Sequence, residues 1–336
     1  MGLSQVSLFL ILEVVLLFVN GGSGTTFSII NQCGYTVWPG LLSGAGTSPL
    51  PTTGFVLNPS ETRVIPIPAA WSGRIWGRTL CSQDESTGKF SCITGNCGSS
   101  ALECSGTGAE PPATLAEFTL NGAGGLDFYD VSLVDGYNIP MTIVPQAGVP
   151  SAGNCTATGC ITDLNGPCPA VLKVSSRSPE QAVACKSACE AFGEPQYCCS
   201  GAYGTPDTCK PSEYSEFFKS ACPRAYSYAY DDGTSTFTCS GADYVIPFCP
   251  SPTTSMKSLQ PEAVIVSTAS PRFSAAFSFG VLAAAVWTVG RVCLYILFIG
   301  KSDQFFFFFL HYQYRRRLEK KSFRRKICFV QEIKYQ

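Results

Sequence analysis

Residues 111–141, PPATLAEFTLNGAGGLDFYDVSLVDGYNIPM, carry the clearest structural pattern in the chain. Two apolar, β-prone runs, LAEFTL and LDFYDVSLV, flank the turn-rich segment NGAGG. This arrangement is typical of a β-hairpin whose loop has several residues. Because side chains alternate along a strand, Glu117 shares a face with Thr119, and Asp130 shares a face with Ser132. The stretch therefore predicts an antiparallel hairpin with one apolar and one polar face.

The same stretch is rich in acidic residues. It holds the carboxylates Glu117, Asp127, Asp130 and Asp135 and contains no Lys or Arg. If the polar faces line a groove, the groove is an acidic cleft on a rigid sheet. The alternative is that these acids only solvate the outer face of an antiparallel sheet, with Asp135 before Gly136 serving a turn.

Cysteine usage indicates an oxidising compartment. Of the 18 cysteines, 16 fall between Cys33 and Cys249, an even number in a Gly- and Pro-rich region, which favours disulfides over zinc ligation. The only histidine is His311, so mechanisms that need a histidine base are excluded from the Cys-rich region. Acid–base chemistry there would fall to carboxylates, and we expect neither a metal nor another cofactor.

Charge divides the chain in two. Residues 25–250 contain 19 acidic against 10 basic side chains, whereas residues 301–336 contain 10 basic against 3 acidic ones. An acidic globular part argues against nucleic acid as its partner.

The N-terminus favours the secretory pathway. Residues 6–19 are apolar except for Ser7 and Glu13, and the small residues Gly22, Ser23 and Gly24 follow. We interpret residues 1–24 as a signal peptide, with Thr25 as the mature start. Asn154 then begins a glycosylation sequon, Asn-Cys-Thr, whose middle residue is itself a candidate disulfide cysteine.

One segment outside the hairpin predicts a helix. In SPEQAVACKSACEAFG, residues 178–193, Ser178 is a natural N-cap, Pro179 suits the first helical position and Gly193 suits termination. On such a helix Cys185 and Cys189 would share one face. A structural staple is a better interpretation of that pair than a reactive thiol pair.

The rest of the folded part consists of short β-prone segments separated by turns. They include NQCGYTVWPG, WSGRIWGRTLC and GKFSCITGNCG, and such spacing favours an antiparallel sandwich or barrel. Together with TLAEFTL and LDFYDVSLVDGYNIPM, these segments resemble the thaumatin-like proteins, the pathogenesis-related group five family of plants. The resemblance covers residues 25–250, with Asn96 standing where an Asp is usual in the family.

The resemblance implies the fold and its divisions. It implies a mainly β, disulfide-rich, flattened lectin-like β-sandwich formed by about residues 25–150 and 223–250. A small cysteine-looped insert would span residues 81–104, and a helix/loop subdomain would span residues 155–222. The cysteine order implies the pairs Cys33–Cys249, Cys81–Cys92, Cys97–Cys104, Cys155–Cys239, Cys160–Cys222, Cys168–Cys185, Cys189–Cys198 and Cys199–Cys209.

The resemblance also implies a binding cleft. Its expected acidic members are Glu110, Glu117, Asp130, Asp135 and one of the pair Asp231 and Asp232. Asp231 is favoured within that pair, because Asp232 can instead serve a turn with Gly233. The nearby aromatic residues Phe128 and Tyr129 would contribute if they are exposed. The family's cleft carries an Arg, and Glu110 occupies the position that we align with it. We therefore expect an added acid instead of a cation, with crowded charge raising one or more carboxyl pKa values.

Three functions are then open. The first is a secreted or surface-attached antifungal defence protein, expected to be a monomer, that binds β-1,3-glucan or a related cell-wall glycan. The second is weak endo-β-1,3-glucanase activity with Glu117 as the acid and Asp130 or Asp135 as its partner. The third is a protein-binding module, either an inhibitor of foreign hydrolases or the ectodomain of a surface receptor, although no kinase pattern follows.

The C-terminal part differs in character from the folded part. Residues 251–272 form a Ser/Thr/Pro linker, and residues 273–299 are an apolar candidate for a transmembrane or anchor segment. The basic tail, residues 300–336, fits the cytoplasmic flank of a membrane span. Two alternatives stay open: a glycolipid-anchor signal, and translated non-coding sequence after about residue 300.

Overall fold

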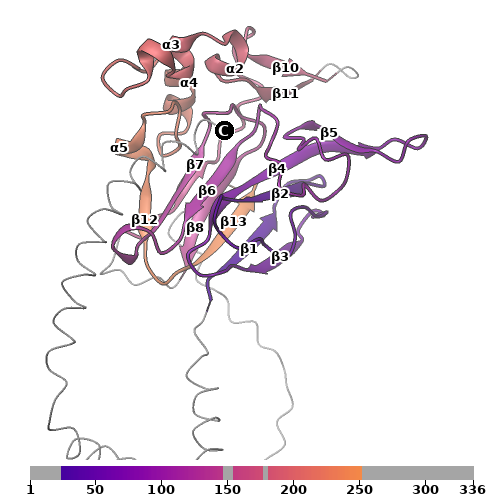
Figure 1. The fold of residues 1–336 in the computed structure, drawn as a ribbon. Coiled ribbons are helices and arrows are strands. Elements are labelled where there is room, and N and C mark those ends of the chain that lie inside the picture. Colours follow the sequence, from indigo (N-terminus) through magenta and orange to yellow (C-terminus); the bar gives the residue numbers. More distant parts are fainter. Residues whose placement is uncertain (1–23, 147–153, 177–180, 252–336) are drawn as a thin grey trace, which may run out of the picture. The chain divides into compact units, whose positions relative to one another are not determined.

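The computed structural model describes residues 24–146, 154–176 and 181–251, which build two β-sheets packed as a sandwich (Figure 1). The expected fold class, a mainly β, disulfide-rich sandwich, is confirmed. The expected linker from residue 252 onward, the apolar segment and the basic tail lie outside the described residues, as does the signal peptide up to residue 23.

The first sheet has five strands in the order β3-β1-β13-β8-β9. Its strands are β1 (Thr26–Asn31), β3 (Thr62–Pro66), β8 (Met141–Gln146), β9 (Thr158–Cys160) and β13 (Asp243–Phe248). All neighbours pair antiparallel except β1 and β13, which run parallel. This pairing joins the first and last strands of the fold, and the Cys33–Cys249 disulfide closes the same junction.

The second sheet follows the order β12-β7-β6-β4-β2, with β5 paired to β4. Its strands are β2 (Trp38–Ser43), β4 (Ser72–Gln83), β5 (Phe90–Thr94), β6 (Leu115–Thr119), β7 (Asp127–Ser132) and β12 (Phe237–Cys239). Strands β6 and β7 form the expected hairpin, with a short 3₁₀ turn, η1 (Ala123–Gly125), in its loop. Figure 1 shows the outer part of β4 projecting with β5 away from the sandwich.

The core between the sheets is aromatic. Phe27 packs against Phe118 with ring centroids 4.4 Å apart, and Tyr244 lies 5.2 Å from Phe118 and 5.3 Å from Tyr129. These four rings come from β1, β6, β7 and β13 and are all nearly fully buried. Large aromatic side chains contribute much of the hydrophobic free energy of folding, so they fix the stacking of the two sheets.

A second, smaller cluster lies on the other face of the second sheet. Trp76 and Leu115 are buried there against Cys97 and Cys104, which form the disulfide of the small insert. The fully buried Arg78 ties the insert to the sheet, donating hydrogen bonds to the carbonyls of Trp38 and Leu102 at 2.9 and 2.7 Å. The insert therefore covers one end of this outer face.

A helix-containing part adjoins one end of the sandwich, at the top of Figure 1. It comprises β10 (Lys173–Ser175), β11 (Ala182–Cys185), α2 (Ala188–Phe192), α3 (Pro195–Cys198), η2 (Gly201–Tyr203) and α4 (Glu213–Ala221). Helix α5 (Asp232–Ser235) follows in the loop that leads back to β12. Tyr137, at the start of the segment leading to β8, exchanges two backbone hydrogen bonds with Cys185 of β11, at 2.8 and 2.7 Å.

The single helix predicted over residues 178–193 is wrong in its first half. Ala182–Cys185 is strand β11, paired with β10, and helix α2 begins only after Ser187. The hydrogen bonds to Tyr137 and the Cys168–Cys185 disulfide hold this segment extended, which overrides its local helix preference. The expected termination at Gly193 is confirmed, because that residue caps α2 in the left-handed conformation.

The structure contains eight disulfides, and they are the eight pairs that the family resemblance implies. Cys185 and Cys189 bond to Cys168 and Cys198, respectively, so they staple separate elements. Removing a native disulfide from a small secreted domain costs about 2–5 kcal/mol. The bridges therefore stabilise a helix-containing part whose elements are too short to be stable alone.

Candidate functional site

A row of charged side chains crosses the outer face of the second sheet. Strand register places Arg74 of β4 opposite Glu117 of β6, and Glu117 opposite Asp130 of β7. The neighbouring residues Phe118 and Tyr129 point the other way, into the core. Directly opposed residues on an antiparallel pair have Cβ atoms about 4.5–5.5 Å apart. The predicted hairpin thus brings Glu117 and Asp130 side by side, both partly exposed.

The expectation that the cleft lacks a cation is wrong, because Arg74 lies in this row. Glu110, which we aligned with the family's Arg, is instead an exposed residue beside the small insert. Its Oε2 accepts a hydrogen bond from Nδ2 of Asn96 at 3.2 Å. The segment WSGRIWGRTLC contains two arginines, Arg74 and Arg78, and the sequence alone does not show which of them faces Glu117. The register of β4 against β6 shows that it is Arg74.

Asp135 lies in the loop after β7 and approaches the same row. Burial raises the pKa of its carboxyl, and the positive charge of Arg74 opposes that rise. Desolvation, not the expected crowding of acids, is therefore the main cause of the shift. The loop is anchored by a hydrogen bond from the Ala113 amide to the Asp135 carbonyl at 2.9 Å.

Gly136 allows this loop to pack tightly. Its φ is +85°, and an added Cβ would lie 2.7 Å from the Cys185 carbonyl oxygen and 2.8 Å from Cβ of Pro112. Only glycine fits both the conformation and the space. The position of Asp135 therefore depends on close contact between the loop and β11.

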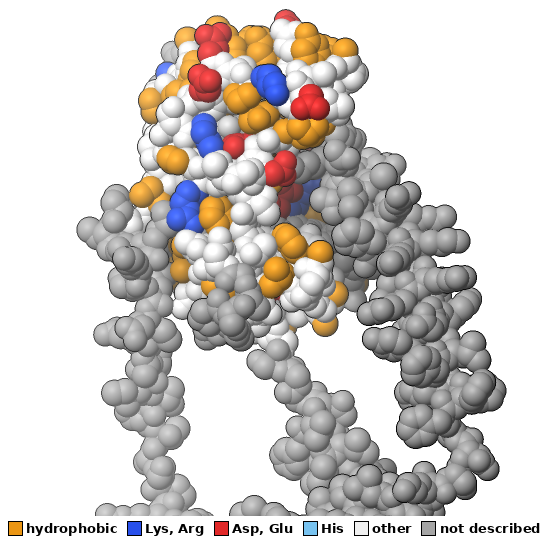
Figure 2. Space-filling view, turned by 90° about the vertical axis from the view of Figure 1, so that its left-hand side faces the viewer, with side chains coloured by type: hydrophobic (Ala, Val, Ile, Leu, Met, Phe, Trp, Pro, Cys, Tyr) orange, Lys and Arg blue, Asp and Glu red, His pale blue; other side chains and the backbone are white. Residues whose placement is uncertain are grey.

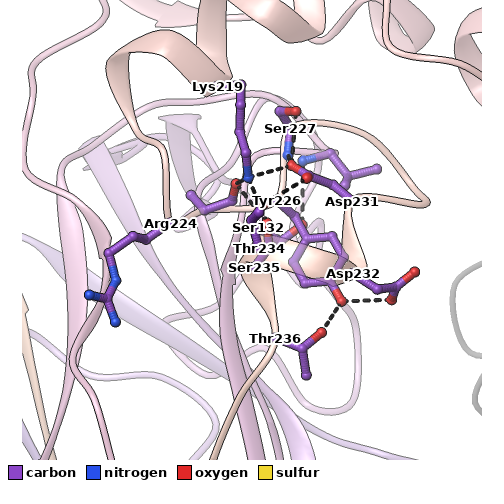
Figure 3. A network of polar contacts seen from close by, with 12 residues as sticks. Ser132, Lys219, Arg224, Tyr226, Ser227, Asp231, Asp232, Thr234, Ser235 and Thr236 are labelled. Atoms are coloured by element: carbon purple, nitrogen blue, oxygen red, sulfur yellow. Dashed lines mark hydrogen bonds and ion pairs between the residues drawn. The ribbon is translucent and has the colours of Figure 1, made fainter.

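The Asp231 carboxylate lies in a dense polar network (Figure 3). Its Oδ2 accepts hydrogen bonds from the amide and hydroxyl of Ser227, both at 3.0 Å, and pairs with the Lys219 ammonium at 2.8 Å. Its Oδ1 accepts from the Thr234 hydroxyl at 3.1 Å. These contacts show that Asp231 holds the loop around α5 in place.

Tyr226 links this loop to the sheet and was not singled out by the sequence analysis. Its amide donates to the Val131 carbonyl at 2.9 Å, and its hydroxyl donates to Oδ1 of Asp232 at 2.8 Å and contacts Thr236. Burial raises the pKa of Tyr226, and the charges of Asp130 and Asp232 act in the same direction. Asp130 and Asp232 therefore both lie close to the Tyr226 hydroxyl.

The two expected cleft aromatics differ in position. Tyr129 is 1% exposed, and its hydroxyl donates to the Thr156 carbonyl at 2.9 Å, so the expectation that it lines the cleft is wrong. Alternation along β7 explains this, because Tyr129 faces the core between Phe128 and Asp130. Phe128 is partly exposed on the same face as Asp130.

Surface charge, metal-ligand grouping and helix length complete the description of this part of the chain. On the face shown in Figure 2, acidic and basic side chains lie together at the level where the helix-containing part adjoins the sandwich.

Among the residues that the structure describes, no group of three or more His, Cys, Asp or Glu side chains could hold a metal ion. In the same part of the chain, no helix is long and apolar enough to cross a membrane. Asn154, the sequon residue, is exposed and follows residues outside the described part.

Comparison with known proteins defines the class. The fold and its eight disulfides are those of a thaumatin-like β-sandwich, and the Thaumatin family model matches residues 31–250. Thaumatin-like protein 1 of Arabidopsis thaliana is 56% identical over 257 residues, covering 74% of this chain and 96% of the relative. Pathogenesis-related thaumatin-like protein 3.5 of Cryptomeria japonica is 56% identical over 241 residues, covering 71% and 96%.

The chain belongs to the thaumatin family, which includes the pathogenesis-related plant defence proteins. The PR5-like receptor kinase of Arabidopsis thaliana is also similar, with 52% identity over 241 residues, covering 71% of this chain and 36% of the kinase. Proteins of this family are typically extracellular, in agreement with the disulfide content of this chain.

Proposed function

We propose that this chain is an antifungal defence protein that binds β-1,3-glucan-type cell-wall polysaccharide across the outer face of β4, β6 and β7. The observation that carries the proposal is the cross-strand row Arg74, Glu117 and Asp130 on a rigid sheet. A carboxylate accepts hydrogen bonds from sugar hydroxyls, and a guanidinium donates to them. Charge-assisted hydrogen bonds of this kind are about twice as strong as neutral ones.

The protein would act outside the cell as a monomer. The acidic excess of residues 25–250 suits a neutral glycan better than an anionic polymer. Attachment to a membrane through residues 273–299 stays a prediction, because that segment lies outside the described residues.

Weak hydrolysis of the bound glucan is a secondary part of the proposal. Glycoside hydrolysis needs two carboxyl groups, about 5–5.5 Å apart for retention of configuration. Strand register supports this pairing, because it sets Glu117 opposite Asp130, where Cβ atoms of opposed residues are about 4.5–5.5 Å apart. The raised pKa of Asp135 suits a proton donor, the role that the sequence analysis gave to Glu117.

Binding is tested by calorimetric titration of the secreted protein with a soluble β-1,3-glucan. Arg74→Gln should weaken binding about 10–100-fold, since hydrogen bonds to charged groups contribute about 1.5–3 kcal/mol. Glu85→Gln is the matched control, because Glu85 is exposed at the far end of the projecting β4–β5 hairpin. Absence of glucan binding by the wild type, or equal affinity of Arg74→Gln, would refute the proposal.

Hydrolysis is tested by release of reducing ends from the same glucan. Glu117→Gln keeps the shape of the side chain but cannot exchange a proton, so a catalytic Glu117 predicts a fall of about 10²–10⁴-fold in rate. Asp130→Asn and Asp135→Asn are measured in the same assay. The variant whose rate falls comparably identifies the second carboxyl group of the catalytic pair. Wild-type protein that binds glucan but releases no reducing ends has a binding cleft without catalysis.

A second candidate function is inhibition of a foreign hydrolase through protein contact. The projecting hairpin of β4 and β5 carries the exposed side chains Leu80 and Ile93, which are 49% and 55% exposed. Apolar side chains on a projecting hairpin suit insertion into a partner's groove. Capture of a fungal xylanase by the wild type but not by Ile93→Ser would support this candidate, and no capture by either would exclude it for that enzyme.

A further inference from the structure

The chain contains one glycosylation sequon that can act as an acceptor. Asparagine followed two residues later by Ser or Thr occurs at Asn154-Cys155-Thr156 and at Asn58-Pro59-Ser60. Proline in the middle position excludes the second. An N-linked glycan on this chain would therefore be carried by Asn154, in a sequon whose middle residue is a cysteine.

The folded chain holds this sequon at the outer edge of β12, the terminal strand of the second sheet. Thr238 of β12 donates its amide to Oδ1 of Asn154 at 3.4 Å, and its carbonyl accepts a hydrogen bond from the Cys155 amide at 2.9 Å. The contact to Asn154 uses the side-chain oxygen and not Nδ2, the atom that carries an N-linked sugar. Because Asn154 is exposed, a glycan on Nδ2 would project into solvent and leave the core undisturbed.

Folding fixes the sequon in a closed conformation. Cys155 is bonded to Cys239, with Cα atoms 4.5 Å apart, and its φ of +42° lies in the left-handed region. The Thr156 hydroxyl donates to the Asn154 carbonyl at 3.0 Å. A transferase has to enclose the acceptor amide and contact the Thr hydroxyl, and in the folded chain both groups are already bonded to backbone atoms. A glycan on Asn154 must therefore be attached before this segment folds.

The positions of the cysteines provide time for that attachment. Cys239 lies 84 positions after Cys155. At a synthesis rate of about 5–20 residues per second, Cys239 is made about 4–17 s after its partner. Of the five earlier cysteines, four form the bridges Cys81–Cys92 and Cys97–Cys104, which span only 11 and 7 positions and can close locally. The sequon is thus an open segment of chain during this interval.

We propose that Asn154 carries an N-linked glycan and that the glycan is attached before the Cys155–Cys239 bridge closes. The donor is an oligosaccharide on a lipid diphosphate. A bond forms between Nδ2 of Asn154 and the anomeric carbon of the first sugar, the bond from that carbon to the diphosphate oxygen breaks, and one amide proton passes to a base of the transferase. The bridge closes afterwards, when the two thiols give up two electrons and two protons to a thiol oxidant of the secretory pathway. The inference is independent of glucan binding.

The test uses the full-length chain expressed in a secreting eukaryotic cell. The secreted and the intracellular protein are weighed by mass spectrometry before and after treatment with a peptide-N-glycosidase. Asn154→Gln removes the acceptor, and Thr156→Ala removes the hydroxyl that Thr156→Ser keeps. Asn58→Gln is the matched control, since Asn58 is an exposed asparagine in the sequon that proline excludes. Cys239→Ser leaves the sequon intact and removes the partner of Cys155, and its intracellular chains can be weighed even when they are not secreted.

Wild-type protein, Asn58→Gln and Thr156→Ser should each lose the mass of one glycan on treatment, whereas Asn154→Gln and Thr156→Ala should lose none. The occupied fraction of intracellular Cys239→Ser should equal that of the wild type, because the bridge plays no part when the glycan is attached. A wild-type mass that treatment leaves unchanged overturns the glycan site. A higher occupied fraction in Cys239→Ser than in the wild type overturns the order of events, because it shows that the bridge closes first in part of the wild-type chains.

Discussion

Lys219 of α4 anchors the loop that carries Asp231 and Asp232. Replacing this lysine should lower the free energy of unfolding. Its ammonium group pairs with Oδ2 of Asp231 at 2.8 Å and donates to Oγ of Ser235 at 2.8 Å and the Ala225 carbonyl at 3.1 Å. The two charged side chains are 26% and 12% exposed. Lys219→Met keeps most of the apolar stem and removes only the charge and its three hydrogen bonds.

The expected loss follows from this intermediate burial. Breaking a buried ion pair costs about 3–5 kcal/mol, whereas an exposed pair contributes about 0–1 kcal/mol. We expect Lys219→Met to lower the free energy of unfolding by about 2–4 kcal/mol, between these limits. At about 2–4 °C per kcal/mol for a domain of this size, the Tm should fall by about 4–16 °C.

The measurement is thermal and guanidinium unfolding followed by near-ultraviolet circular dichroism, with all disulfides intact. Lys186→Met is the control, because the Lys186–Glu190 pair is an i,i+4 contact of 3.9 Å with side chains 38% and 35% exposed. Its loss should cost no more than about 0.5 kcal/mol. Equal destabilisation by the two variants would refute the assignment of Lys219 as the anchor of this loop.

Three further predictions concern the loop after β7 and the cysteines. Gly136→Ala should lower the free energy of unfolding by more than about 2 kcal/mol, because it adds both backbone strain and a steric clash. Gly124→Ala is the control, since Gly124 has φ +69° and open space around it, so that substitution adds strain alone. Equal losses of unfolding free energy in the two variants would contradict the clash at Gly136. Burial raises the pKa of Asp135 above its ordinary value of 3.8, so the folded state binds this proton more tightly than the unfolded chain does. The free energy of unfolding should therefore fall as the pH rises from below 3.8 through the pKa of the folded state. Asp135→Asn should therefore lessen that fall between about pH 3 and 7 in urea unfolding, and an unaltered pH profile would show that ionisation of Asp135 costs nothing. Thiol titration of the denatured, unreduced chain should find at most the two thiols of Cys293 and Cys328, so a larger number would contradict the eight bridges.

The sequence predicted those features whose cause is local. The β6–β7 hairpin follows from alternation and a turn-rich loop, and its register then places Glu117 opposite Asp130. The helix over residues 178–193 failed where the cause is distant, since Tyr137 and Cys168 hold Cys185 in an extended segment. Its C-terminal end at Gly193 was still correct, because that termination needs only the residue's own left-handed conformation.

The electrostatic character of the site could not be predicted in the same way. Arg74 is 43 positions before Glu117 in the chain, and only the pairing of β4 with β6 brings it opposite that carboxylate. The raised pKa of Asp135 likewise depends on burial of its carboxyl in the folded chain. Neither effect leaves a periodic signal in the sequence. Alignment of the family's cleft Arg by position along the chain therefore pointed to Glu110 instead of Arg74.

The carboxylates of the candidate site are held by separate sets of contacts, and this separation lets their roles be examined one at a time. Glu117 and Asp130 are fixed by the register of two core strands, whose inward neighbours Phe118 and Tyr129 are buried. Asp135 depends on the packing of Gly136, and Asp232 depends on the loop that Lys219 anchors. A variant at Gly136 or Lys219 should therefore move one carboxylate and leave the central pair in place. If glucan binding depends on the central pair alone, it should survive both changes, and if it falls with either, the sugar contacts the outlying carboxylate as well.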